Sequence, residues 1–175
     1  SSMNVVAGAG ESLVGRFSPV RLYPFSFREY LLYKGIEEKK QKLGKVKLPS
    51  REIALRFRDY LAEGGLPELY RSNRPLEDLR DDLDLVIYRD MAQLFNLGNA
   101  STMKGLFNQI SAQTGQRLSY NKLSNALDSD FRTVKKYVDH LESSYLISTS
   151  KPYEGSARKT ASKRPKVYVA DHAYN

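Results

Sequence analysis

The stretch DSDFRTVKKYVDHLESSY, residues 128–145, decides the fold of the C-terminal part of the chain. Its apolar residues recur at alternating spacings of three and four, the pattern of an amphipathic helix with one buried face: Phe131, Val134, Val138, Leu141 and Tyr145. Asp130 is a favourable N-cap, because its carboxylate can accept hydrogen bonds from the first unpaired backbone N–H groups. The opposite face carries Arg132, Lys135 and Lys136, so the stretch predicts a helix with a cationic exposed side.

The segments around this helix complete a known order of elements. Residues 120–127 predict a short helix, and residues 128–130 a turn between the two helices. Residues 146–150 and 167–170 predict the two strands of a hairpin. Two helices joined by a tight turn and followed by a hairpin are typical of a winged helix-turn-helix, whose second helix enters the major groove of DNA. The sequence therefore predicts a winged helix domain over 116–175.

The loop between the two predicted strands is strongly basic. Residues 151–166 hold six basic side chains against one acidic side chain. At its tip we expect four cations to neutralise DNA phosphates, which would make binding weaken with salt; they are Arg158, Lys159, Lys163 and Arg164. On the helix, Arg132 is positioned to reach base edges, whereas Lys135 and Lys136 suit phosphates. The alternative is that this winged helix docks onto protein, since basic surface loops are common.

The residues before this domain predict a helical section over 25–115. Ser26 and Glu29 form a capping box at its start. Helices are expected over 26–35, 50–64, 76–95 and 100–114. The second of them is expected to bury Ile53, Phe57, Tyr60 and Leu61. The predicted fold is thus mainly α, a helical lid-like section followed by a winged helix-turn-helix domain with a small β-hairpin.

Composition limits the kinds of site that this chain can hold. The 175 residues carry a net charge of +8, which favours an anionic partner such as nucleic acid. The absence of cysteine excludes disulfides and thiolate metal sites, and two histidines make a zinc site improbable, so we expect no metal site. No apolar run is long enough to cross a bilayer, and we expect a cytoplasmic protein without a membrane partner.

Several short motifs, in the same order along the chain, resemble the C-terminal part of a prokaryotic AAA+-type ATPase family that ends in a domain called DUF4143. The matching stretches are 12–16 (SLVGR), 24–31 (PFSFREYL), 64–68 (GGLPE), 87–90 (IYRD), 118–123 (LSYNKL), 133–138 (TVKKYV) and 166–171 (KVYVAD). This resemblance implies that residues 1–24 are a remnant of an ATPase core. It also implies that Arg16 acts as an arginine finger on a nucleotide's γ-phosphate, the alternative being a local cap or ion pair.

The N-terminal glycines do not form a phosphate-binding loop by themselves. Gly10 and Gly15 have the spacing G-x-x-x-x-G, but Arg16 and Phe17 stand where such a loop needs Lys and then Ser or Thr. We therefore expect this chain alone to be non-catalytic and to hold no cofactor, with ATP and Mg²⁺ bound only by a longer parent ATPase whose core is missing here. The expected function is DNA binding by the C-terminal region of that ATPase. The alternatives are protein docking or homo-oligomerisation of the ATPase, and a free-standing transcription regulator.

Overall fold

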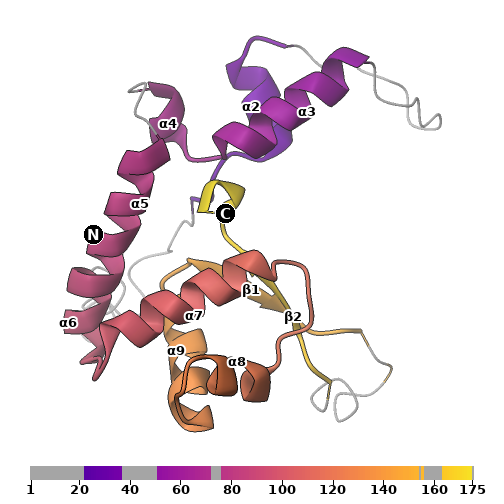
Figure 1. The fold of residues 1–175 in the computed structure, drawn as a ribbon. Coiled ribbons are helices and arrows are strands. Elements are labelled where there is room, and N and C mark those ends of the chain that lie inside the picture. Colours follow the sequence, from indigo (N-terminus) through magenta and orange to yellow (C-terminus); the bar gives the residue numbers. More distant parts are fainter. Residues whose placement is uncertain (1–21, 37–50, 72–75, 154, 156–162, 175) are drawn as a thin grey trace, which may run out of the picture. The chain divides into compact units, whose positions relative to one another are not determined.

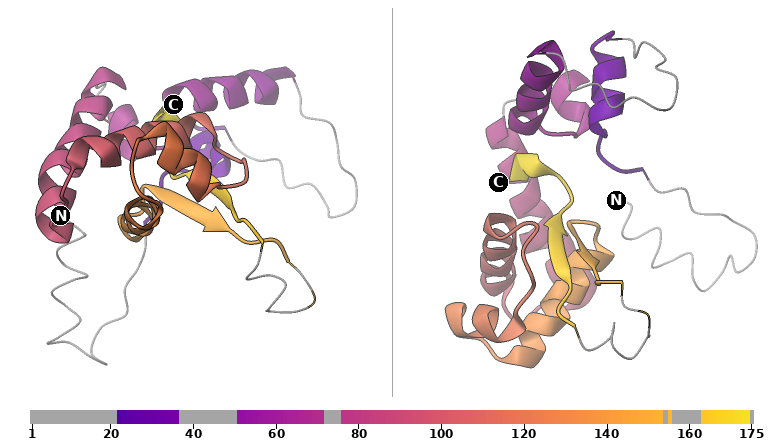
Figure 2. Two further views of the ribbon diagram at one scale, coloured as in Figure 1. Left: turned by 60° about the horizontal axis from the view of Figure 1, so that its bottom comes forward. Right: turned by 90° about the vertical axis from the view of Figure 1, so that its right-hand side faces the viewer.

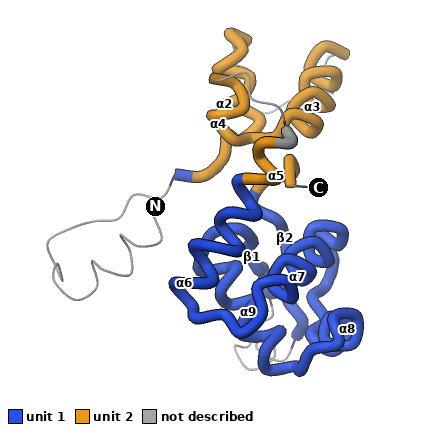
Figure 3. The backbone as a smooth tube through the Cα atoms, turned by 60° about the vertical axis from the view of Figure 1, so that its left-hand side comes forward, with its two compact units in different colours: residues 1–22, 82–170 blue, residues 23–81, 171–175 orange. Residues whose placement is uncertain are grey.

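The computed structural model describes residues 22–36, 51–71, 76–153, 155 and 163–174 (Figure 1). The fold is mainly helical with a two-stranded antiparallel sheet, which confirms the predicted class at that level. The chain divides into two compact units, one holding Leu22 and residues 82–170, the other residues 23–81 and 171–175 (Figure 3). The two units are not consecutive stretches of sequence, because residues 171–175 belong with residues 23–81.

The unit of residues 23–81 is built from short helices. They are α2 (Phe27–Tyr33), α3 (Arg51–Glu63), α4 (Pro67–Arg71), the first part of α5 (Leu76–Leu85) and the 3-10 turn η2 (His172–Tyr174). The predicted capping box of α2 is confirmed. The Ser26 backbone N–H donates to Glu29 Oε2 over 2.8 Å, and the Glu29 N–H donates to Ser26 Oγ over 3.4 Å.

The residues that follow α3 pack against the C-terminal segment of the chain and form a hydrogen bond with it. Gly64 has φ +89°, which favours glycine, and a Cβ there would meet the Cβ of Ala173. The Asp171 carboxylate, only 2% exposed, accepts hydrogen bonds from the N–H groups of Gly65 and Ala173, each 2.8 Å long. A Cβ on Gly65 would lie 2.7 Å from the Phe25 carbonyl oxygen. The two glycines thus permit a close backbone approach that larger residues would block.

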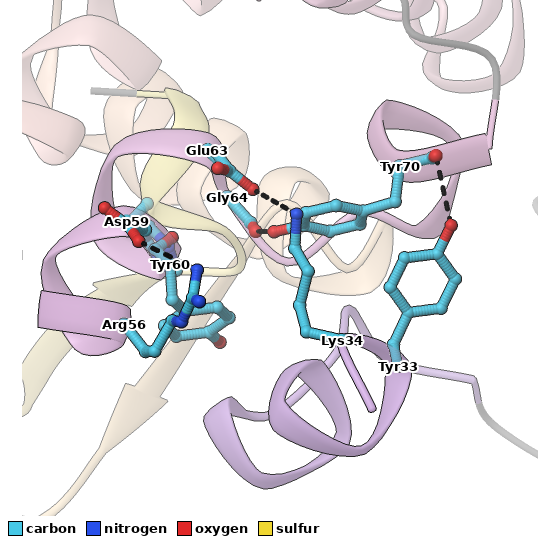
Figure 4. A network of polar contacts seen from close by, with 9 residues as sticks. Tyr33, Lys34, Arg56, Asp59, Tyr60, Glu63, Gly64 and Tyr70 are labelled. Carbon is cyan, nitrogen blue, oxygen red and sulfur yellow. Dashed lines mark hydrogen bonds and ion pairs between the residues drawn. The ribbon is translucent and has the colours of Figure 1, made fainter. Parts of the chain in front are cut away.

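Aromatic rings fill the centre of this unit, around the fully buried Tyr30. The Lys34 ammonium lies 5.4 Å from the Tyr30 ring centroid and 5.2 Å from that of Tyr70, and pairs with Glu63 over 3.4 Å (Figure 4). Burial, followed by the nearby Glu63 carboxylate, raises the pKa of Tyr70. Its hydroxyl therefore stays protonated and donates to the Gly64 carbonyl oxygen.

The expectation that α3 buries a full apolar stripe is wrong. No residue of α3 is buried, and Phe57 and Leu61 are 44% and 46% exposed. The helix packs through one side only, where the Phe57 ring meets Phe27 and the Tyr60 ring meets His172. Leu61 lies outside that contact, so its side chain remains at the surface.

The other unit starts with the rest of a long helical run. The helix predicted over 76–95 is confirmed as α5, a π-helical segment η1 (Val86–Met91) and α6 (Ala92–Phe95) in succession. The helix α7 (Ala100–Ala112) follows, capped by Asn99, whose side-chain oxygen accepts from the Thr102 N–H over 3.1 Å. Its inner face is almost fully buried and forms the centre of this unit: Met103, Leu106, Phe107 and Ile110.

The remaining elements of this unit are α8 (Tyr120–Ala126), α9 (Phe131–Ser143) and the strands β1 (Ile147–Ser150) and β2 (Lys166–Val169) (Figure 2). The predicted hairpin strands are confirmed, with β1 and β2 antiparallel and Ile147 opposite Val169. Arg117 forms an isolated antiparallel bridge to Lys166 on β2. A short extended segment before α8 therefore lies against the hairpin.

Candidate nucleic-acid interface

The helix α9 buries the central part of its predicted apolar face and exposes its cations, whereas Phe131 and Tyr145, predicted at the ends of that face, are 47% and 40% exposed. Val134, Val138 and Leu141 are at most 1% exposed, on the side that contacts α7, α8 and β1. Arg132, Lys135 and Lys136 are all exposed. Spacings of three and four residues place these three side chains on one side of a helix. The buried face holds α9 in place while the cationic face remains open to a ligand.

The N-terminus of α9 is fixed by its cap. Asp130 Oδ1 accepts from the backbone N–H groups of Arg132 and Thr133 over 2.8 and 3.0 Å, as the sequence predicts. Hydrogen bonds from the hydroxyl and then the backbone of Thr133 lower the pKa of Asp130. The carboxylate thus stays charged and keeps the first turn, which carries Arg132, in a defined position.

The turn between α8 and α9 is held by a backbone hydrogen bond and a ring contact. Asp128 has φ +47°, a left-handed conformation that Asp tolerates better than most residues. The Ser129 N–H donates to the Ser124 carbonyl oxygen over 3.1 Å. The rings of Tyr120 and Phe131, the first residues of the two helices, meet edge to face with centroids 5.6 Å apart. These contacts join the starts of both helices.

The basic hairpin loop is described only in part. Lys163 and Arg164 are exposed, as is Lys166 at the start of β2, while the predicted Arg158 and Lys159 lie outside the described residues. The exposed Arg117 was not predicted as a site residue. Its bridge to Lys166 places it beside the start of β2. Pairing between residues 49 positions apart leaves no local signal.

A second missed cation, Lys122, is exposed on α8. Its position on the outer side of the short helix could have been read from the spacing to the buried Leu123 and Ser124. Arg117 and Lys122 add two cations to a unit that already carries Arg132, Lys135 and Lys136.

His140 lies on α9 but adds no charge to the cationic face near neutral pH. Its ring stacks on Phe95, with centroids 3.9 Å apart and planes inclined by 15°. The Nε2 atom is buried and has no hydrogen-bond partner among the described residues. Burial, and then the positive charge of Lys136, lower the pKa of His140. The ring is therefore a neutral packing group in the folded protein.

In the part of the chain that the structure describes, no three histidine or acidic side chains gather closely enough to hold a metal ion. Over the same ranges, no helix combines the length and apolar content needed to cross a membrane. Arg16, predicted as an arginine finger, lies outside the described residues.

Comparison with known proteins gives a family but no activity. A family model described as "Domain of unknown function (DUF8612)" matches residues 54–174. An uncharacterized protein of Haemophilus influenzae is 24% identical over 98% of this chain and 42% of its own length. One of Methanocaldococcus jannaschii is 27% identical over 94% of this chain and 38% of its own. The chain thus spans about two fifths of the length of these relatives. No solved structure matches.

The resemblance to AAA+-type ATPases with a DUF4143 domain is wrong, because the matching family model is a different one. The motifs that suggested it are short, and several have local structural causes. In 64–68, for example, both glycines are required by the approach of Phe25 and Ala173. The nucleotide role of Arg16 and the parent ATPase rested on that resemblance and lose their basis with it.

Proposed function

The chain belongs to the DUF8612 family, a domain of unknown function, and we propose that its residues 100–170 bind double-stranded DNA as a winged helix. The observation that carries this proposal is the cationic face of α9, held outward by a buried apolar face. The order of elements supports it: helix α7, the bridged segment at Arg117, helices α8 and α9, then strands β1 and β2. This order is typical of a winged helix, in which α9 would be the recognition helix.

The charge of this segment supports an anionic partner. Residues 116–170 carry eleven Lys and Arg against five Asp and Glu, so most of the net charge of the chain lies here. Arg132 stands in the first turn of α9, the part of a recognition helix that meets base edges. Lys135 and Lys136 lie one turn later and would contact phosphates, with Lys163 and Arg164 from the hairpin loop.

Fluorescence anisotropy with a labelled duplex, at low and at moderate salt, tests the proposal. Four phosphate contacts would weaken binding about 100-fold between ~50 and ~200 mM salt. Replacing both Lys135 and Lys136 by Ala should weaken binding to every DNA sequence. It should also reduce the slope of the logarithm of the binding constant against the logarithm of the salt concentration by about two. Arg132→Ala should cost about 1–3 kcal/mol of binding free energy and relax base preference.

The matched control is Arg71→Ala, which removes an exposed cation from α4 in the other unit and should leave binding unchanged. Equal loss from Arg71→Ala and from the α9 variants would mean non-specific attraction by net charge. Absence of binding at low salt would refute DNA binding and favour the alternative, in which the winged helix docks onto protein.

A further inference from the structure

The outer side of α3 is an apolar surface that the described chain leaves uncovered. Leu55 is 50% exposed and Leu61 is 46% exposed. Ala54 and Ala62 are exposed beside them, and Arg58 stands between the two leucines. These positions follow one stripe of the helix, at spacings of one, three and four residues. The stripe combines two large apolar side chains with a central cation.

Arg58 has no ion-pair partner among the described residues. Arg56, two positions earlier, pairs with Asp59 over 3.7 Å on the same helix (Figure 4). Arg58 is exposed, and the small side chains of Ala54 and Ala62 allow another helix backbone to come close on either side of it. The stripe therefore fits a helix that offers an apolar side chain and a carboxylate one turn apart.

The helix α5 offers that combination. Asp81 is exposed, and Leu85, four residues later on the same face, is 53% exposed. Asp81 has no ion-pair partner within the described ranges. These residues of α3 and of α5 are thus exposed in the part of the chain that the structure describes.

We propose that the outer face of α3 binds α5 of a second copy of this chain. With the two helices antiparallel, Arg58 meets Asp81 and Leu55 meets Leu85. The three-residue step on α3 and the four-residue step on α5 correspond to rises of about 4.5 and 6 Å, a difference that side chains absorb. Opposite charges and apolar residues thus fall in one register.

Each copy supplies one α3 and one α5, so a pair of copies is the smallest assembly that this contact predicts. Contacts between short helical segments bury little area, so the pair lies near the lower end of specific interfaces, below about 1,200 Å². Association is therefore weak and concentration-dependent. The contact involves neither α9 nor the hairpin, so the proposed association is independent of the proposed DNA binding.

Sedimentation velocity of the full chain without DNA, over a wide range of protein concentration, tests the proposal. The wild type should shift from monomer to dimer as concentration rises. Arg58→Glu and Asp81→Arg, each placing like charges together, should weaken the dimer about tenfold or more. Combining both substitutions restores opposite charges and should recover most of the wild-type association.

The matched control is Arg80→Glu, an exposed charge reversal next to Asp81 but on another side of α5. It should leave the dimer intact, and circular dichroism should show that all variants keep the wild-type helix content. A wild type that stays monomeric at the highest concentration would overturn the proposal. So would a double variant that associates no better than either single variant.

Discussion

The helices α3 and α9 are both thirteen residues long, and both carry apolar and polar residues at helical spacings. They differ in how much of the apolar face is buried. The apolar face of α9 is covered by α7, α8 and β1, and its central residues are fully buried. The helix α3 packs against α2 and η2 on one side and buries none of its residues completely. An amphipathic pattern predicts a helix reliably, but the partners that surround the helix decide how much of it is buried.

The largest expected effect separates the two helices directly. Leu141→Ala on α9 should lower the free energy of unfolding by about 2–5 kcal/mol, because it leaves a cavity in a closed core. Leu61→Ala on α3 should cost only about 0.5 kcal/mol, since its side chain is already half exposed. Urea denaturation followed by circular dichroism measures both. Equal losses would show that the outer side of α3 is covered in solution, as self-association at the measured concentration would cause.

A second prediction concerns what holds the unit of α3 together in place of a closed core. Gly65→Ala should destabilise the protein by about 1–3 kcal/mol, because the added methyl group would overlap the Phe25 carbonyl oxygen. Gly98→Ala is the matched control, since a Cβ there meets no atom within 4 Å. Thermal denaturation of the two variants checks this. A tolerated Gly65→Ala would mean that the junction with Asp171 is looser than the hydrogen bonds indicate.

The smallest effect is a pH dependence in the unit of α9. The folded state lowers the pKa of His140 below its ordinary value of 6.5, so the neutral ring is favoured on folding. The stabilisation is therefore complete above the unfolded pKa and is lost as the pH falls below 6.5. His140→Phe keeps a ring against Phe95 but cannot titrate. As the pH falls below 6.5, the wild type should lose unfolding free energy relative to His140→Phe. Parallel curves for the two proteins would rule out a contribution from His140.

The sequence alone was sufficient where the signal is local. The Asp130 cap, the α2 capping box, the two strands and the central part of the α9 stripe each follow from residues a few positions apart, and each is confirmed. The ends of the predicted stripe, Phe131 and Tyr145, are instead 47% and 40% exposed. Non-local features were not accessible in this way. The bridge between Arg117 and Lys166 depends on chain folding, as does the uncovered side of α3.

The family resemblance failed for a related reason. Short motifs such as 64–68 record local packing requirements, and glycines that relieve a backbone clash carry no information about nucleotide chemistry. The same difference between local and non-local features applies to the residues of the candidate site. The cations of α9 could be located from helical spacing, whereas the contribution of Arg117 required knowledge of strand pairing.

The hydrogen bond from Gly65 to Asp171 joins residues 106 positions apart and has a consequence for synthesis of the chain. A ribosome completes residues 23–81 long before it adds Asp171, and the tunnel delays the emergence of that residue further. Until then Gly64 and Gly65 lack the groups against which they pack. The unit of residues 23–81 therefore cannot complete its native contacts until the later Asp171 has been added to the chain.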